Sequence, residues 1–143
     1  MAALEVPVEL WTHLQAMATE VFKPRGSILF RRGDEVSGVF LLRSGRVKLG
    51  LGCDENAYPS RILGAGGLAG LPATMSGARY SLTAEVMEDS RVAFVPREAV
   101  LELLKKNSYL SFQVMQLLSE EISGMRSTLK GDLASSKGGR AKV

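Results

Sequence analysis

The sequence has very few of the residues that bind metals or form cross-links. Its 143 residues include one cysteine and one histidine. A single cysteine excludes a disulfide within the chain, and it excludes a zinc site or iron–sulfur cluster held by four cysteines of one chain. Histidine-assisted catalysis would have to use His13, and no metalloprotease, Walker A or nucleophile-elbow motif is present. These absences argue against an enzyme.

The sequence also lacks a long apolar run. Its longest window without a charged residue, 62–78, has 17 residues, of which five are glycine and one is proline. A spanning helix needs about 20 apolar residues. The first residues show neither a basic segment nor an apolar one, so we expect no signal peptide, no membrane association and a cytoplasmic location. At about 150 residues per domain, the length indicates one compact domain.

Basic residues are concentrated at the C-terminal end of the chain. The formal net charge is +3, but residues 126–143 carry +4 and the first 125 residues carry −1. Nucleic-acid binding requires a basic face on the folded body. We therefore expect residues 131–143 to be a flexible basic tail, and we expect no DNA binding by this chain alone.

Glycine divides the chain into regions of different structure. Eleven of the fifteen glycines lie from Gly26 to Gly77, and none lies in 78–123. Short apolar runs alternate with these glycines and predict strands, with turns at 33–34 and 44–45. The predicted strands cover residues 27–30, 39–42, 47–51, 61–63, 81–87 and 91–95. Many short strands with regular turns are typical of a β-sandwich or barrel.

Three helices are expected to flank these strands. Apolar residues at spacings of three and four predict a helix over 6–22. Pro96 favours the start of a second helix, and Lys105 and Lys106 favour its end. A third helix is predicted over 108–130. The expected fold class is mainly β with flanking helices.

The third predicted helix carries two apolar stripes. One has the spacing of a coiled-coil seam and consists of Met115, Leu118, Ile122, Met125 and Leu129. The other consists of Leu110, Val114 and Leu117. One stripe can pack on the sandwich while the seam meets a second copy, which predicts a homodimer. The alternative is a helix buried entirely in its own core.

Three segments in this order resemble the cyclic-nucleotide-binding-like sensor domain of the Crp/Fnr family of bacterial regulators. Residues 26–49 resemble the family's strand–turn–strand element, with Gly33-Asp34 followed by four apolar residues and Gly45. Residues 70–86 resemble its effector cassette, and 92–104 resemble its last strand and following helix. The likeness covers 6–130, which places the sensor domain at residues 1–130.

The resemblance implies a jelly-roll β-sandwich with an N-terminal helix and a long C-terminal dimerisation helix. It also implies that the domain senses a small-molecule effector of the cyclic-nucleotide type and signals through the dimer helix. In such regulators a DNA-reading helix-turn-helix follows that helix. Here thirteen residues follow Lys130, so we expect that half to be absent from the chain. The alternative is a degenerate domain that acts in dimerisation or protein interaction without binding a nucleotide.

The resemblance also supplies candidate ligand-binding residues, and the cassette departs from the family pattern. Nucleotide-binding relatives have a glycine, a glutamate that accepts from the ribose hydroxyl, and a later arginine for the phosphate. In this chain Gly70 matches the glycine, but Leu71 takes the place of the acid, and Pro72 removes a backbone N–H. The candidate ligand-binding residues are Gly70, Leu71, Pro72, Arg79, Tyr80 and Ser81.

Arg79 is either the phosphate partner or a solvated loop arginine. Ser127 and Thr128 match the helix positions where relatives contact adenine. Cyclic AMP or a related nucleotide is the effector that the family implies, and Leu71 predicts weak binding or none. On the cassette alone, Leu71→Glu is expected to restore part of the affinity.

Other effectors of the family are disfavoured by this sequence. Haem would need an axial ligand, and His13 lies in the first predicted helix, where a surface or packing role is expected. Cys53 lies beside Asp54 and Glu55, whose charges should raise the thiol pKa and lower its reactivity. No metal or prosthetic group is therefore assigned.

Overall fold

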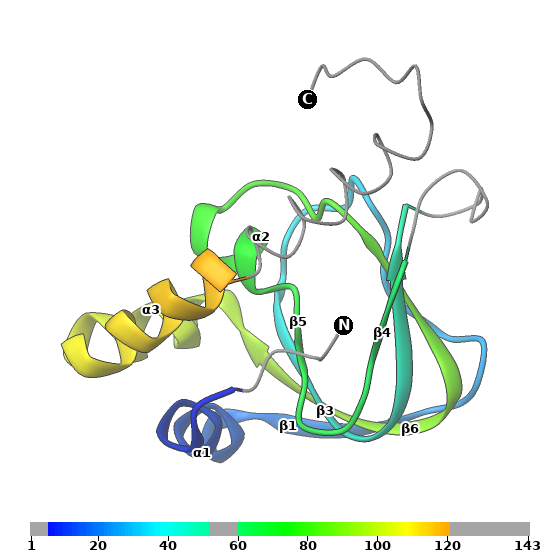
Figure 1. The fold of residues 1–143 in the computed structure, drawn as a ribbon, viewed down its shortest axis with the longest axis horizontal. Coiled ribbons are helices and arrows are strands. Elements are labelled where there is room, and N and C mark those ends of the chain that lie inside the picture. The colour runs from blue at the N-terminus through cyan, green and yellow to red at the C-terminus, as the bar shows by residue number, and fades with distance from the viewer. Residues whose placement is uncertain (1–5, 52–59, 121–143) are drawn as a thin grey trace.

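The computed structural model describes residues 6–51 and 60–120 of the chain. Within these ranges the elements are α1 (Val8–Met17), β1 (Thr19–Lys23), β2 (Ile28–Phe30), β3 (Gly38–Gly50), β4 (Arg61–Leu63), β5 (Leu68–Ala69), α2 (Leu71–Ser76), β6 (Thr83–Pro96) and α3 (Arg97–Lys106). A further helix occupies residues 108–120. α1 and α3 lie together at one end of the molecule, and the strands curl beside them (Figure 1).

The two long strands β3 and β6 organise an antiparallel sheet. They pair with each other, and the strand order is β1-β6-β3-β4. β2 pairs with β6, and β5 pairs with β3. Every pairing is antiparallel. The predicted fold class, mainly β with flanking helices, is confirmed.

Alternation along the strands divides the buried residues into two sets, because successive side chains point to opposite faces. The helix-side core lies between the sheet and the helices. It contains Leu10, Leu14, Val39, Leu41, Leu71, Ala93, Val95, Val100, Leu104, Leu110, Val114 and Leu117. The inner core lies on the opposite face of β3 and β6. It contains Phe30, Leu42, Val47, Leu49, Ala69, Ala73, Tyr80, Ala84, Val86 and Val92.

A bulge bends the central strand pair, and it replaces a predicted turn. Between the partners Leu42↔Val92 and Val47↔Val86, β3 advances five residues while β6 advances six. At this point Gly45 has a φ of 103°, and a Cβ there would overlap the side chain of Ser90. The turn expected at 44–45 is therefore wrong: the strand continues through it, and the bulge shifts its alternation by one residue.

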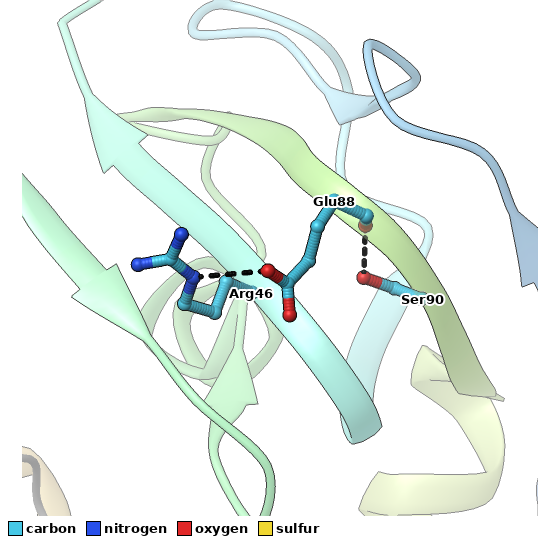
Figure 2. A network of polar contacts seen from close by, with 3 residues as sticks. All are labelled: Arg46, Glu88 and Ser90. Atoms are coloured by element: carbon cyan, nitrogen blue, oxygen red, sulfur yellow. Dashed lines mark hydrogen bonds and ion pairs between the residues drawn. The ribbon is translucent and has the colours of Figure 1, made fainter.

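Polar contacts hold the β6 side of this bulge. Figure 2 shows Arg46 reaching across from β3 to Glu88, with an Nε to Oε1 distance of 3.3 Å. The hydroxyl of the buried Ser90 donates to the Glu88 carbonyl oxygen at 2.7 Å. The Arg46–Glu88 pair is exposed, so it contributes at most about 1 kcal/mol. The close approach of Gly45 to Ser90 is the stricter constraint on the sequence.

The first helix is shorter than predicted. α1 ends at Met17, and β1 begins at Thr19. Val21 fits the helical spacing, but it pairs with Val92 of β6 instead. Sheet pairing therefore overrides the apolar period, and the expectation of one helix over 6–22 is wrong.

The prediction of a helix after Pro96 is confirmed, with α3 starting at Arg97 and ending at Lys106. The following helix begins at residue 108 and is described as far as 120. The rest of the predicted 108–130 helix, the domain boundary at residue 130 and the tail at 131–143 lie outside the described residues. Among the described residues, no helix is long and apolar enough to cross a membrane.

Candidate effector-binding site

Gly70 is the pivot of the cassette. It lies between β5 and α2, and its φ of 88° is in the left-handed region that favours glycine. A Cβ at this position would lie 3.1 Å from the carbonyl oxygen of Gly38 and 3.1 Å from Cε1 of Tyr80. Glycine is thus required by both the backbone conformation and the close packing against β3. Contact of Gly70 with a ligand stays a prediction.

Leu71 packs into the helix-side core. Its side chain is 3% exposed and joins the cluster that contains Leu10, Leu14 and Val100. Its neighbours Ala69 and Ala73 belong to the inner core. At the position where the resemblance places an acid, this chain therefore turns an apolar side chain toward its helices. The role of Leu71 in ligand binding stays a prediction, but its burial reverses our expectation for Leu71→Glu, because a carboxylate there would lie among apolar groups.

Tyr80 is the most tightly held residue of the candidate site. Its hydroxyl donates to the Gly38 carbonyl oxygen at 2.8 Å and accepts from the backbone N–H groups of Ser37 and Gly38, both at 3.1 Å. Its ring stacks on Phe30 with centroids 3.9 Å apart and planes 12° from parallel. The residue as a whole is 3% exposed. Tyr80 thus engages two convergent N–H groups of the kind that bind anions.

Arg79 lies on the outside of the domain and holds a turn. Its Nη1 donates to the Gly33 carbonyl oxygen at 2.9 Å, and its Nη2 is 3.8 Å from Oε2 of Glu35. Backbone hydrogen bonds between Tyr80 and the residues 33–34 run alongside these contacts. The Arg79 side chain is 63% exposed, so its pair with Glu35 is weak. Pro72 and Ser81 are also exposed.

Arg97 fixes the cassette helix α2, a role that the sequence did not reveal. Its Nε donates to the Thr74 carbonyl oxygen at 2.8 Å, and its backbone N–H donates to the Ser37 carbonyl oxygen at 2.9 Å. Gly77 ends α2 with a φ of 79°, and a Cβ there would lie 2.9 Å from Nη2 of Arg97. A glycine that ends a short helix is the sequence signal that could have located α2.

A row of aromatic rings lies on the inward face of the sheet, which is the face that carries the inner core. The row was not predicted from the sequence. Phe30 lies 5.7 Å from Phe40, and Phe40 lies 4.9 Å from Phe94, measured between ring centroids. Phe30 is buried, whereas Phe40 and Phe94 are partly exposed. Together with Tyr80 they form a continuous series of ring contacts from the cassette to β6. Such surfaces favour flat apolar groups.

The remaining polar candidates are His13, Cys53, Ser127 and Thr128, and of these the described residues include only His13. His13 is exposed on α1, where its Nδ1 lies 2.8 Å from the Glu9 carbonyl oxygen. Cys53, Ser127 and Thr128 lie outside the described residues. Within the described ranges, no group of three or more His, Cys, Asp or Glu residues is arranged to hold a metal ion.

The pKa of one carboxyl outside the cassette is perturbed. The pKa of Glu9 is lowered, first by a hydrogen bond from the Gln113 side chain, then by a backbone hydrogen bond and by the charge of His13. Gln113 Nε2 donates to Glu9 Oε1 at 3.2 Å, which links α1 to the helix at 108–120. Gln113 is buried, and its Oε1 has no hydrogen-bond partner in the structure.

The stripes of the helix at 108–120 are only partly described. Leu110, Val114 and Leu117 are buried in the helix-side core, as one of the two predicted stripes requires. In the predicted seam, Met115 is 62% exposed and Leu118 packs partly against the helix-side core. The other seam positions lie outside the described residues: Ile122, Met125 and Leu129.

Comparison with known proteins places this geometry in a family. The family model described as "Cyclic nucleotide-binding domain" matches residues 20–107, which run from the second residue of β1 to the end of α3 and include the whole cassette. The chain belongs to the cyclic nucleotide-binding domain family. The match confirms the fold that the three segments 26–49, 70–86 and 92–104 implied, and the relatives include Crp/Fnr-type regulators.

Two curated relatives show how the domain is used elsewhere. The "Fumarate and nitrate reduction regulatory protein" of Escherichia coli is 35% identical over 103 residues, covering 70% of this chain and 40% of that protein. The "Transcriptional activator protein anr" of Pseudomonas aeruginosa is 29% identical over 134 residues, covering 85% of this chain and 52% of that protein. The chain spans about half the length of such relatives or less.

The solved structures agree on the fold. The Thermus thermophilus catabolite activator protein superposes with a TM-score of 0.70 at 24% identity, covering 91% of this chain and 61% of that chain. A transcriptional regulator from Thermotoga maritima gives 0.69 at 20% identity, covering 83% and 94%. These likenesses establish the arrangement of the strands. What the inward face can bind depends on the side chains of this chain.

Proposed function

We propose that this chain is the effector-sensing part of a Crp/Fnr-type transcriptional regulator that acts in the cytoplasm. The observation that supports this proposal most strongly is the family match over residues 20–107. This range contains a sheet that curls (Figure 1). Two aromatic residues on its inward face, Phe40 and Phe94, are partly exposed. The relatives that are named as regulators support a role in gene control. A small molecule would bind against the inward face without being chemically changed, so the chain is not an enzyme.

Dimerisation belongs to this proposal. The helix at 108–120 buries Leu110, Val114 and Leu117 against its own sheet, and it leaves Met115 exposed on another face. In a homodimer formed along that face, a ligand-induced shift of the sheet in one protomer could be passed to the other protomer through the paired helices. This is the route by which the effector signal would leave the domain.

The effector is not expected to be cyclic AMP. Recognition of its ribose requires an acceptor, yet the cassette has Leu71 in the helix-side core and no carboxylate among the buried residues of the inner core. The hydroxyl of Tyr80 is engaged by β3, and Arg79 lies outside. The inward face is therefore better suited to an apolar ligand.

Ligand-dependent stabilisation tests this function. Equilibrium unfolding is measured with low-molecular-mass fractions of an extract from the source cells, and separately with cyclic AMP and cyclic GMP. A ligand that binds only the folded state at a hundred times its Kd adds about 2.7 kcal/mol to the free energy of unfolding. We expect one extract fraction to stabilise the chain and neither cyclic nucleotide to do so at comparable concentration.

Two variants localise that effect. Phe94→Ala removes a partly exposed ring from the inward face and should reduce the stabilisation. Tyr109→Ala changes a side chain that is 61% exposed on the helix at 108–120 and should leave the stabilisation unchanged. If no fraction stabilises the wild type, the sensing function fails, and the alternative is a domain that acts only in dimerisation or protein interaction.

A further inference from the structure

The strand register places a cation on the inward face. Antiparallel pairing sets Arg61 of β4 opposite Leu49 of β3, and Leu63 opposite Val47. Directly paired residues project to the same side of a sheet. Because Val47 and Leu49 belong to the inner core, Arg61 lies on the inward face at the start of β4. Ile62, between Arg61 and Leu63, lies on the outer face and is 48% exposed.

Apolar residues continue the row that begins at Arg61. Leu49 pairs with Ala84 of β6, and Ala84 pairs with Phe30 of β2. Phe30 in turn stacks on Tyr80. The row therefore runs from a guanidinium to the ring of Tyr80 in the cassette without passing a carboxylate. Arg61 itself is only partly exposed.

This row differs from the surroundings of Arg79. Arg79 donates to the turn at Gly33 and lies beside Glu35 on the outside. It is therefore oriented to hold the turn, while Arg61 borders the apolar face. Arg61 already has an interaction of its own in the structure. A guanidinium has five N–H donors, so it can hold more than one acceptor at a time.

We infer that Arg61, rather than Arg79, is the anion-binding residue of the effector site, and that the effector is a small apolar anion such as an aromatic carboxylate or sulfonate. This inference rests on the proposed function, in which a small molecule binds against the inward face of the sheet. The guanidinium would bind the charged group in a forked hydrogen-bonded pair. The partly exposed Phe40 and Phe94 would contact its flat apolar part.

The inner core also explains why the ligand should lack a sugar. Its buried members are alanine, valine, leucine, phenylalanine and Tyr80, whose hydroxyl is already bonded to Gly38. Hydroxyl groups placed against these side chains would lose their hydrogen bonds to water without gaining protein partners. A charge at one end and an apolar ring at the other match the arrangement of this face.

A pair of fluorescent probes separates the charge from the ring. 1-Anilinonaphthalene-8-sulfonate carries an anionic sulfonate, and N-phenyl-1-naphthylamine has the same rings without it. Both are titrated into the full chain, and fluorescence gives the Kd. We expect saturable binding of both probes to the wild type. Arg61→Leu should weaken the sulfonate about 10- to 100-fold and change the neutral probe less than about twofold.

Matched variants control for charge and folding. Arg79→Leu removes the same charge from the outer surface and should leave both affinities within about twofold of wild type. Arg61→Lys should recover part of the sulfonate affinity, because it restores the charge without the fork. If Arg61→Leu does not fold, Arg61→Gln is used in its place, and circular dichroism confirms the native state of each variant.

Three results would overturn the inference. They are no saturable sulfonate binding, equal sulfonate binding by the wild type and the Arg61→Leu or Arg61→Gln variant, and loss of binding in Phe112→Ser but not in the Arg61 variants. The last result would place the probe on the helix at 108–120, where Phe112 is 55% exposed. Stabilisation by a cell extract together with any of these results would keep the sensing function and reject Arg61 as its anion-binding residue.

Discussion

Removal of one oxygen atom from Tyr80 provides a sharp test of the cassette geometry. Tyr80→Phe keeps the ring that stacks on Phe30 but deletes the hydroxyl. The hydroxyl donates to the Gly38 carbonyl oxygen at 2.8 Å and accepts from the N–H groups of Ser37 and Gly38. Three contacts with the backbone at Ser37 and Gly38, where β3 begins, depend on this one atom.

The expected cost follows from the burial of these partners. Gly38 is buried, so both its N–H and its C=O would lose their partner at this point, whereas Ser37 is exposed and its N–H can bind water. An unsatisfied buried polar group costs about 1–3 kcal/mol. With two such groups, we expect Tyr80→Phe to lower the free energy of unfolding by about 2–6 kcal/mol.

Urea unfolding followed by circular dichroism measures this loss. Tyr109→Phe is the matched control, because Tyr109 is 61% exposed and the same oxygen is removed from the surface. Its effect should stay within about 0.5 kcal/mol. A loss below about 0.5 kcal/mol for Tyr80→Phe would refute the argument that this hydroxyl fixes the start of β3.

Three further predictions concern the helices. Leu71→Glu should lower the free energy of unfolding by at least about 3 kcal/mol and give no cyclic AMP binding. The control Leu71→Met should lower it by less than about 1.5 kcal/mol. Wild-type stability of the Leu71→Glu variant would contradict the burial of Leu71. In sedimentation over a concentration series, the wild-type chain and the control Gln116→Glu should be dimers, and Met115→Glu should be a monomer. A monomeric wild type would refute dimerisation along the predicted seam. Because the pKa of Glu9 is lowered in the folded state, its stabilising effect should be complete at neutral pH and decline as the pH falls below about 4.5, its ordinary value. The stability difference between wild type and Glu9→Gln should therefore shrink on acidification, and a difference that grows would contradict the hydrogen bond from Gln113.

Local sequence signals predicted the elements whose ends are set locally. Pro96 marks the start of α3, because its fixed φ suits a helix start and it lacks an N–H. β4 has the predicted bounds, Arg61–Leu63: it begins at a charged residue, and Gly64 follows its last residue. In both cases the information lies within a few residues of the boundary.

Tertiary pairing decided the elements that the sequence did not predict. Val21 continues the helical spacing of α1, yet its pairing with Val92 makes it part of a strand. Gly45 has the positive φ of a turn glycine, but an extra residue on β6 makes it part of a bulge. Such outcomes depend on the partner strand, and the local pattern contains no information about it.

The candidate site shows the same limit. The sequence identified Gly70 and the absence of an acid at Leu71, which follow from residue identity. It did not show that Leu71 faces the helices, that Tyr80 bonds to β3, or that Arg61 lies on the inward face. Those facts depend on which side of a curled sheet each position occupies.

Calorimetric titration of the wild-type chain with cyclic AMP tests the central claim most directly. The claim is that the inward face keeps the family's fold but has replaced the polar groups that recognise a ribose phosphate. Loss of a charged hydrogen-bond partner costs about 1.5–3 kcal/mol, which corresponds to about a 10- to 100-fold loss of affinity. We predict no binding heat, or a Kd no tighter than about 100 µM. Submicromolar binding of cyclic AMP at one site per chain would contradict the account.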